Sequence, residues 1–296
     1  MPYDFLALAA AACWAFGSLL SVEPSRHLGA FAFTRWRMFL VGLMLWAATF
    51  VLSGLPAISL DQVGAMAVSG LVGIFVGDTA LFSAMNRLGP RRAGILFATH
   101  AIFSALLGFI VLGERMATQA LIGGCLTVSG VMIAITFGQR KTDNHAWETN
   151  QGRPAIGVAL GLLAALCQAL GSLIAKPAMA DGMDPVAASA IRVSVACAAH
   201  VCLLLIGFKA ALPACRPSVS VLAQTALSGL VSVALGMTLL LLALKFGDVG
   251  MVAILSSVTP ILLLPLLWLR LRRPPAAGAW FGAVLTVIGT GLILSR

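Results

Sequence analysis

The chain has 296 residues, of which 60% are hydrophobic and only 10% are charged, and its mean hydropathy is +1.02. Soluble domains carry about a quarter charged residues, so this composition excludes an ordinary water-soluble protein and predicts a protein of the lipid bilayer. The net charge of +9 would suggest a nucleic acid partner in a soluble protein. Here most Lys and Arg residues fall between apolar runs, where they meet lipid headgroups, so we expect membrane lipids and no nucleic acid as partners.

Ten apolar runs approach the length of about 20 residues that a helix needs to cross a bilayer. We therefore expect an all-α integral membrane protein of the cell membrane, with ten transmembrane helices. Their expected ranges are 5–22, 30–52, 63–85, 93–112, 118–137, 155–175, 186–208, 221–244, 251–269 and 276–294. No basic residue precedes the first run, as a secretory signal peptide would require, so we expect this run to stay in the protein.

The two halves of the chain resemble each other. Positions 69–134 align with 228–293 without a gap, and matched Gly, Ser and Thr residues recur along this repeat alignment. The polar stretch 138–154 lies at the midpoint, so we expect it to link one repeat, 1–137, to a second, 155–296. Five helices is an odd number, so the second repeat should enter the membrane from the opposite side. Many transporters use such inverted repeats for alternating access.

The stretch from Gly77-Asp78-Thr79 to Leu112-Gly113-Glu114-Arg115 resembles the EamA-type repeat of the drug/metabolite transporter superfamily. The second half looks like a less faithful copy, with Ser256-Ser257-Val258-Thr259-Pro260 in its fourth helix. The resemblance implies a ten-helix exporter or permease of metabolites, with a central cavity between two EamA-like repeats. The pattern departs from the family at Ala101, where a proline is usual, and at Arg272-Arg273, which replaces the Gly-Glu pair.

Asp78 is the outstanding polar residue, because it lies near the middle of the third expected span. An ionisable group in hydrocarbon is costly and normally faces a cavity or a partner. We consider two roles for it: a carboxylate that couples protons or binds a cationic substrate group, or a structural ion pair with an arginine of the second helix.

Arg35 and Arg37 lie one to two turns inside the second span, and Arg192 holds a similar place in the seventh. Long arginine side chains can reach the membrane surface from such positions, which is the simpler explanation. The symmetry of Arg37 and Arg192 favours a shared role at the cavity or its gate.

Further candidates are weaker, since each has an ordinary structural explanation. His100 and His200 lie singly on apolar faces, as hydrogen-bonded core histidines do, and we keep His100 as a substrate candidate. Trp14 and Gln168 hold similar places before Gly17 and Gly171 and could line the cavity. Pro260 interrupts the ninth span and frees the Ser256 carbonyl, which makes both residues site candidates, although prolines also merely kink helices.

No cofactor or metal is expected, since the six cysteines include no CxxC pair and five of them lie in apolar runs. No phosphate-binding loop supports ATP drive. The leading hypothesis is a secondary transporter of small metabolites, such as amino acids or drugs, that is coupled to protons through Asp78. The alternatives are a membrane-embedded lipid-modifying enzyme and a structural membrane protein that does not transport.

Charge and resemblance predict opposite orientations. The odd-numbered loops hold twelve Lys and Arg residues, whereas the other side holds four. The positive-inside rule then places the odd loops in the cytoplasm and both termini outside. The resemblance implies both termini inside.

Overall fold

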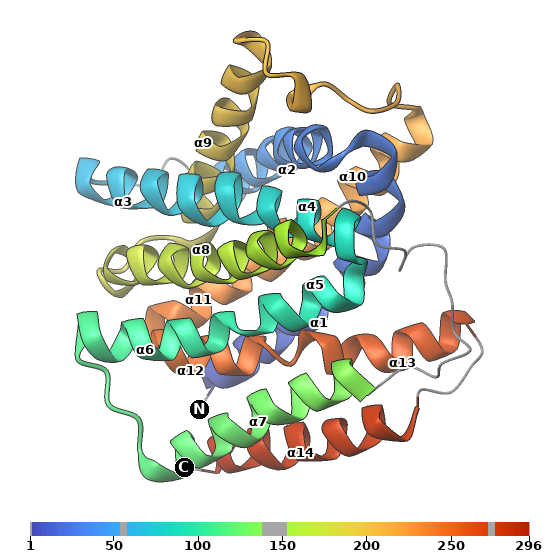
Figure 1. Cartoon of the computed structure of the whole chain (residues 1–296). Helices are drawn as coiled ribbons and strands as arrows, with labels where there is room; N and C mark the ends of the chain where they lie inside the picture. The colour runs from blue at the N-terminus through green and yellow to red at the C-terminus, as the bar shows by residue number, and fades with distance from the viewer. Residues whose placement is uncertain (1, 54–57, 138–152, 272–275, 296) are drawn as a thin grey trace.

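The computed structural model describes residues 2–53, 58–137, 153–271 and 276–295, and all regular structure among them is helical (Figure 1). The linker expected at 138–154 lies outside this description except for its last two residues. Nine of the helices in these ranges are long and apolar enough to cross a membrane, and a tenth apolar helix, Thr118–Ala134, is shorter. The ten expected spans each fall on one of these helices.

The first half contains seven α-helical segments and one π-helix. They are α1 (Pro2–Leu28), α2 (Ala30–Ser53), α3 (Leu60–Gly70), the π-helix η1 (Leu71–Asp78), α4 (Thr79–Leu88), α5 (Pro90–Ala98), α6 (His100–Leu112) and α7 (Thr118–Phe137). Segments α3, η1 and α4 form one continuous rod, and α5 with α6 forms another that bends at Thr99.

The second half repeats this order, with one additional short 3-10 helix. Its elements are α8 (Pro154–Ala180), α9 (Pro185–Leu205), η3 (Lys209–Ala211), α10 (Val219–Gly229), the π-helix η4 (Leu230–Met237), α11 (Thr238–Phe246), α12 (Val249–Ser256), α13 (Thr259–Leu271) and α14 (Ala277–Leu294).

The irregularities of the two halves lie at matched positions. The two π-helices have the same length, and η4 begins at the residue that the repeat alignment pairs with the start of η1. The bent rods match equally well, because α13 begins at the counterpart of the first residue of α6. Proline does not cause the bend, since the first half bends without one; Pro260 instead occupies the second position of α13, where a missing N–H costs little.

The halves are packed by exchanging their first helices. Helix α1 crosses η4 of the second half, and α8 crosses η1 of the first and lies between α4 and the α5–α6 rod (Figure 1). A Cβ at Gly77 would lie 3.1 Å from the Cβ of Cys167, and a Cβ at Gly236 would lie 3.1 Å from that of Cys13. Small residues at these crossings let the backbones approach closely.

Helices α7 and α14 form an antiparallel pair about a local two-fold axis. Gly123 faces Gly289 and Gly130 faces Gly282. The repeat alignment pairs Gly123 with Gly282 and Gly130 with Gly289, so the axis exchanges the two contacts. Between them, the hydroxyl of Thr286 donates to the carbonyl of Thr127 at 3.5 Å.

A third contact between the halves involves Glu114, in the connection after α6. Its carboxylate accepts hydrogen bonds from the backbone amides of Val249 (2.8 Å) and Gly250 (3.3 Å), at the start of α12. A carboxylate at a helix N-terminus satisfies free amides and complements the helix dipole. The residue at the matched position, Arg273, lies outside the described residues.

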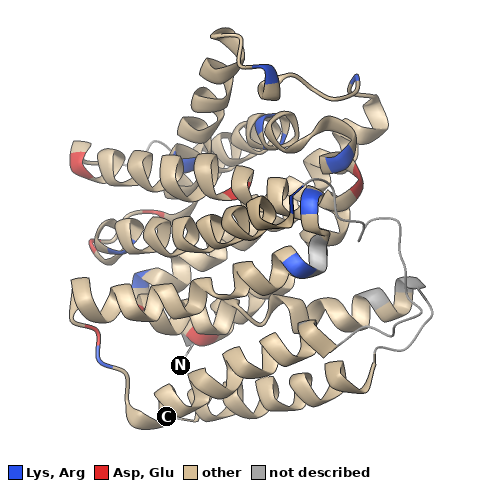
Figure 2. Cartoon of the chain, viewed as in Figure 1, with Lys and Arg blue, Asp and Glu red and all other residues tan. Residues whose placement is uncertain are grey.

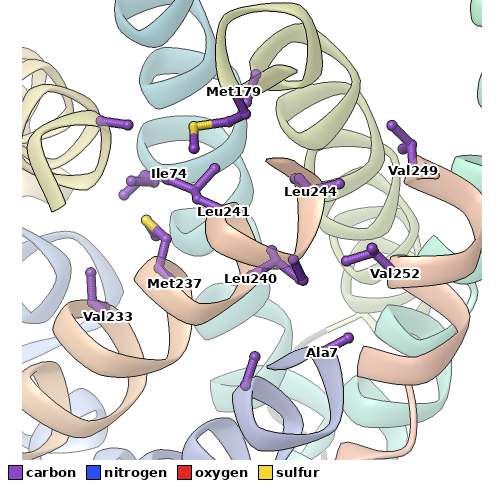
Figure 3. Packing of buried hydrophobic residues seen from close by; sticks show 14 of the residues in the cluster. Ala7, Ile74, Met179, Val233, Met237, Leu240, Leu241, Leu244, Val249 and Val252 are labelled. Carbon is purple, nitrogen blue, oxygen red and sulfur yellow. The ribbon is translucent and has the colours of Figure 1, made fainter. Parts of the chain in front are cut away.

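The apolar core is built from both halves. Ile74 of η1 and Met179 of α8 pack with Val233 and Met237 of η4 and with the leucines of α11 (Figure 3). Met237 is 8% exposed and holds the position that corresponds to Asp78 in the first half. One copy therefore ends its π-helix in a carboxylate, whereas the other ends it in a core side chain.

Candidate functional site

Asp78 is the last residue of η1 and lies inside the span Leu60–Leu88. Its carboxylate forms an ion pair and hydrogen bond with the guanidinium of Arg37 on α2. The Arg37 side chain is 4% exposed, whereas that of Asp78 is 20% exposed. The structure therefore contains the ion pair with a second-helix arginine, and the carboxylate retains some access.

Two phenylalanine rings surround the Arg37 guanidinium. Its central carbon lies 5.2 Å from the ring centre of Phe33 and 4.6 Å from that of Phe82. Phe33 precedes Arg37 by four positions and Phe82 follows Asp78 by four, so each ring lies one helical turn from the ion pair. The rings stabilise the cation through their faces and exclude water from it.

Arg192 of α9 is the second buried cation and is 2% exposed. Its Nε and Nη1 atoms have no hydrogen-bond partner in the described part of the chain. A Cβ added at Gly73 of η1 would lie 3.0 Å from Nη2, so the glycine leaves room for the guanidinium. Asp78 acts electrostatically on Arg192 as well as on Arg37.

The two arginines hold symmetric places in the fold. Gly70, which ends α3, packs against the backbone of Arg192 so closely that a Cβ would clash. Its counterpart in the repeat alignment, Gly229, packs against Arg37 and leaves 3.0 Å between a Cβ and the Arg37 Cγ. The structure thus brings both predicted arginines to matched crossings, and of the two Arg37 is paired with Asp78.

Trp14 and Gln168 lie at the two matched crossings beside the π-helices. The indole N–H of Trp14 donates to the Ser232 carbonyl of η4 at 3.0 Å. Gln168 follows Cys167, which contacts Gly77 next to Asp78, and its side chain is partly exposed. Gln168 therefore lies at the crossing of α8 with η1, whereas Trp14 belongs to the crossing of α1 with η4.

His100, Ser256 and Pro260 lie at the bends of the two broken rods, and their described contacts do not include Asp78. His100 is 2% exposed, with its ring 5.1 Å from that of Phe97. The Ser256 hydroxyl donates to the Ala253 carbonyl at 3.1 Å, and the carbonyl of Ser256 accepts from the Thr259 hydroxyl at 2.9 Å. These bonds satisfy the polar groups that the bend frees.

His200 is the residue that sequence reasoning undervalued. Its Nε2 hydrogen-bonds the Thr79 hydroxyl at 3.1 Å, directly after Asp78, and its ring meets those of Phe31 and Phe75 edge to face. The sequence did contain a signal, because His200 follows Arg192 by eight positions and therefore lies on the same face of α9.

Arg35 does not join the site. Its guanidinium donates to the carbonyl of Ala211 at 2.7 Å and so fastens the connection after α9 to α2. Among the described residues, no group of three or more His, Cys, Asp or Glu side chains is placed to hold a metal.

Comparison with known proteins gives a consistent result. A family model described as the EamA-like transporter family matches residues 1–136 and 155–295. The chain is 30% identical over 125 residues to the uncharacterized transporter YetK of Bacillus subtilis (strain 168), which covers 42% of this chain and 36% of the relative. It is 23% identical over 137 residues to an uncharacterized transporter of Archaeoglobus fulgidus, covering 46% of this chain and 49% of that one.

The alignments thus span about half or less of the length of these curated relatives. A protein of known crystal structure is similar in fold, with a TM-score of 0.77 at 18% identity, covering 98% of this chain and 96% of the other. That similarity concerns the fold alone.

Proposed function

Because this chain belongs to the EamA-like transporter family and is a multi-pass protein of the cell membrane, we propose that it is a secondary transporter of small metabolites that works by alternating access. The family consists of transporters, so the enzyme alternative is set aside. In this proposal the substrates of this protein are small metabolites such as amino acids or drugs, and protons are the coupling ion.

The proposed architecture is ten transmembrane helices in two inverted five-helix repeats, 1–137 and 155–296, joined by the linker 138–154, around a central cavity. The matched π-helices, the matched bends and the symmetric α7–α14 pair support it. π-helical turns occur frequently at functional sites, because their wider turn changes the direction of side chains and carbonyls.

The observation that carries the function is the Asp78–Arg37 pair inside a span. Protonation of Asp78 neutralises the carboxylate and releases the Arg37 guanidinium, which weakens the contact between η1 and α2. Reversible pairing of this kind connects proton binding to the packing of two helices. Gln168, His100, Ser256, Pro260 and Trp14 remain proposed lining residues of the substrate pathway.

The test uses the Asp78→Asn variant, which keeps the shape of the side chain and removes its charge. A metabolite comparison between knockout and overexpressing cells first supplies the substrate. In vesicles with an imposed pH gradient, we expect the wild-type protein to accumulate or expel this substrate and the variant to lose the gradient-driven component. Rates are expressed per folded protein.

The matched control is Asp61→Asn, because Asp61 lies in the first turn of the same rod but is exposed. This variant should transport as the wild type does. If Asp78→Asn supports undiminished gradient-driven transport, Asp78 has no part in the coupling. If no substrate moves in either protein, transport itself is rejected in favour of a structural membrane protein.

A further inference from the structure

The buried charges of the site do not cancel. The site holds two buried cations, Arg37, which is paired with Asp78, and Arg192, whereas Asp78 supplies one negative charge. The other described Asp and Glu side chains lie at or near helix ends or in the connections between helices. They are Asp4, Glu23, Asp61, Glu114, Asp181, Asp184 and Asp248. The site therefore carries one surplus positive charge.

The surplus follows from the difference between the two halves. The arginines occupy matched crossings, but only η1 ends in a carboxylate, since the corresponding residue of η4 is Met237. A buried charge without a partner is strongly unfavourable, so a site with this surplus favours an anion from outside the protein.

Arg192 has the free donors that such an anion needs. Its Nε and Nη1 atoms are buried and have no partner among the described residues. The N–H groups of a planar guanidinium lie in a fixed arrangement that matches the two oxygens of a carboxylate. Arg37 also has a buried Nε without a partner among the described residues, but its Nη2 already donates to Asp78.

We propose that Arg192 binds the carboxylate of the transported metabolite, an assignment that rests on the proposed transport function and specifies its substrate class. A carboxylate carries one negative charge and cancels the surplus, whereas a phosphate monoester carries about 1.5 to 2 and exceeds it. A purely cationic substrate meets the repulsion of Arg192. Simple organic acids cancel the surplus outright, whereas zwitterionic amino acids present the same carboxylate to Arg192 but leave the net charge of the site unchanged; both remain members of the class.

The experiment measures binding to the purified full-length chain in detergent. The probes are butyrate, phenylacetate, leucine and phenylalanine, each at millimolar concentration beside its own primary amide, in which a neutral carboxamide replaces the carboxylate. A ligand that binds the folded state raises the midpoint of thermal unfolding. We expect at least one acid to raise the midpoint and its amide to leave it unchanged. The simple acids and the amino acids show which members of the class are favoured.

Two sets of variants test the role of Arg192. Arg192→Gln should weaken binding of the acid by about tenfold or more, as loss of a charge-assisted hydrogen bond does, and Arg192→Lys should weaken it less. Gly73→Ala displaces the guanidinium without removing its charge, and it should also weaken binding. Its matched control is Gly64→Ala on the same rod, where an added Cβ meets nothing within 4 Å.

The proposal is overturned if every acid and its amide behave alike, or if Gly73→Ala and Arg192→Gln bind the acid as the wild type does. Should Arg192→Gln fail to fold, the pair of glycine variants decides the matter. If the acids bind to the protein but are not transported across vesicle membranes, the assignment of Arg192 stands and the proposed transport function is rejected. If the amides are transported in preference to the acids, the transport function stands and the assignment of Arg192 is rejected.

Discussion

At the scale of single residues, Asp78 pairs directly with Arg37, and Arg192 is the second buried cation of the site. Removing one member of a buried ion pair usually destabilises a protein by about 3–5 kcal/mol, because the other charge is left uncompensated. Here removal of Arg37 and removal of Asp78 should cost different amounts of stability. Without Arg37, the carboxylate still has Arg192 nearby, whereas without Asp78 both cations lose their counter-ion.

We therefore predict that Asp78→Asn lowers the free energy of unfolding more than Arg37→Gln does. The variant that carries both Asp78→Asn and Arg37→Gln should be more stable than the Asp78→Asn variant. It keeps only the charge of Arg192, so the site has one surplus positive charge, as in the wild type. The midpoint of thermal unfolding in detergent measures this order. An Arg37→Gln variant that is less stable than Asp78→Asn would show that Arg192 does not share the carboxylate.

The sequence singled out the three charged residues of this cluster but not their arrangement. Asp78, Arg37 and Arg192 stand out because charges are rare in apolar runs, and the symmetry of the arginines follows from the repeat. Their convergence, and the place of His200 beside Thr79, depend on which faces of α2, α9 and η1 meet. Apolar composition around the whole helix gives no signal of that choice.

At the scale of elements, the apolar runs predict the helices well, because length and hydropathy suffice to identify a span. They do not predict the π-helices, since η1 and η4 contain no proline and are simply more apolar than the helical segments on either side. The bend at Thr99 was also hidden, because Ala101 replaces the proline that marks the other rod at Pro260.

The α7–α14 pair offers a direct test of how closely two elements pack. A Cβ at Gly289 would lie only 2.5 Å from the Gly123 carbonyl oxygen and the Thr127 amide, whereas one at Gly291 meets nothing within 4 Å. We predict that Gly289→Ala destabilises the protein by about 1–3 kcal/mol, the usual cost of overpacking, and that Gly291→Ala does not.

Thermal unfolding of the two variants, side by side, measures the difference. Both positions lie on α14 and both substitutions add one methyl group, so helix propensity and hydrophobicity are matched. Equal midpoints for the two variants would mean that α7 and α14 are not in the close contact that the structure describes.

At the scale of the whole molecule, the halves are bound together by exchange. Helix α1 packs mainly against the second half, and α8 packs mainly against the first. The Glu114 carboxylate joins the end of α6 to the start of α12. The repeat could be predicted from the glycines that recur at equivalent places in both halves, because close helix crossings require them. The packing of each first helix against the opposite half could not be predicted in this way. An internal alignment shows which segments are equivalent, but it does not show which segments are in contact.

The distribution of charge also belongs to this scale. Lys and Arg residues lie mostly toward the ends of the helices (Figure 2). Among the described residues, the odd-numbered connections and the helix ends beside them include Arg26, Arg87, Arg92, Arg153, Lys209 and Arg216. The opposite end has Arg115, Lys176 and Lys245, of which both lysines bind backbone carbonyls at the ends of helices.

We predict from this asymmetry that the odd-numbered connections face the cytoplasm and that both termini lie outside, since basic residues near the ends of spans are retained on the cytoplasmic side. An enzyme reporter that folds only outside the bacterial cytoplasm should be active when fused after Arg296. The same reporter inserted at Lys209, in an odd-numbered connection, should be inactive. The reverse pattern would establish the orientation with both termini inside, and it would mean that the charge asymmetry does not determine insertion. Either orientation leaves the Asp78–Arg37 pair within a span, so the orientation decides which side of the membrane each end of the proposed pathway opens to and not the residues proposed to line it.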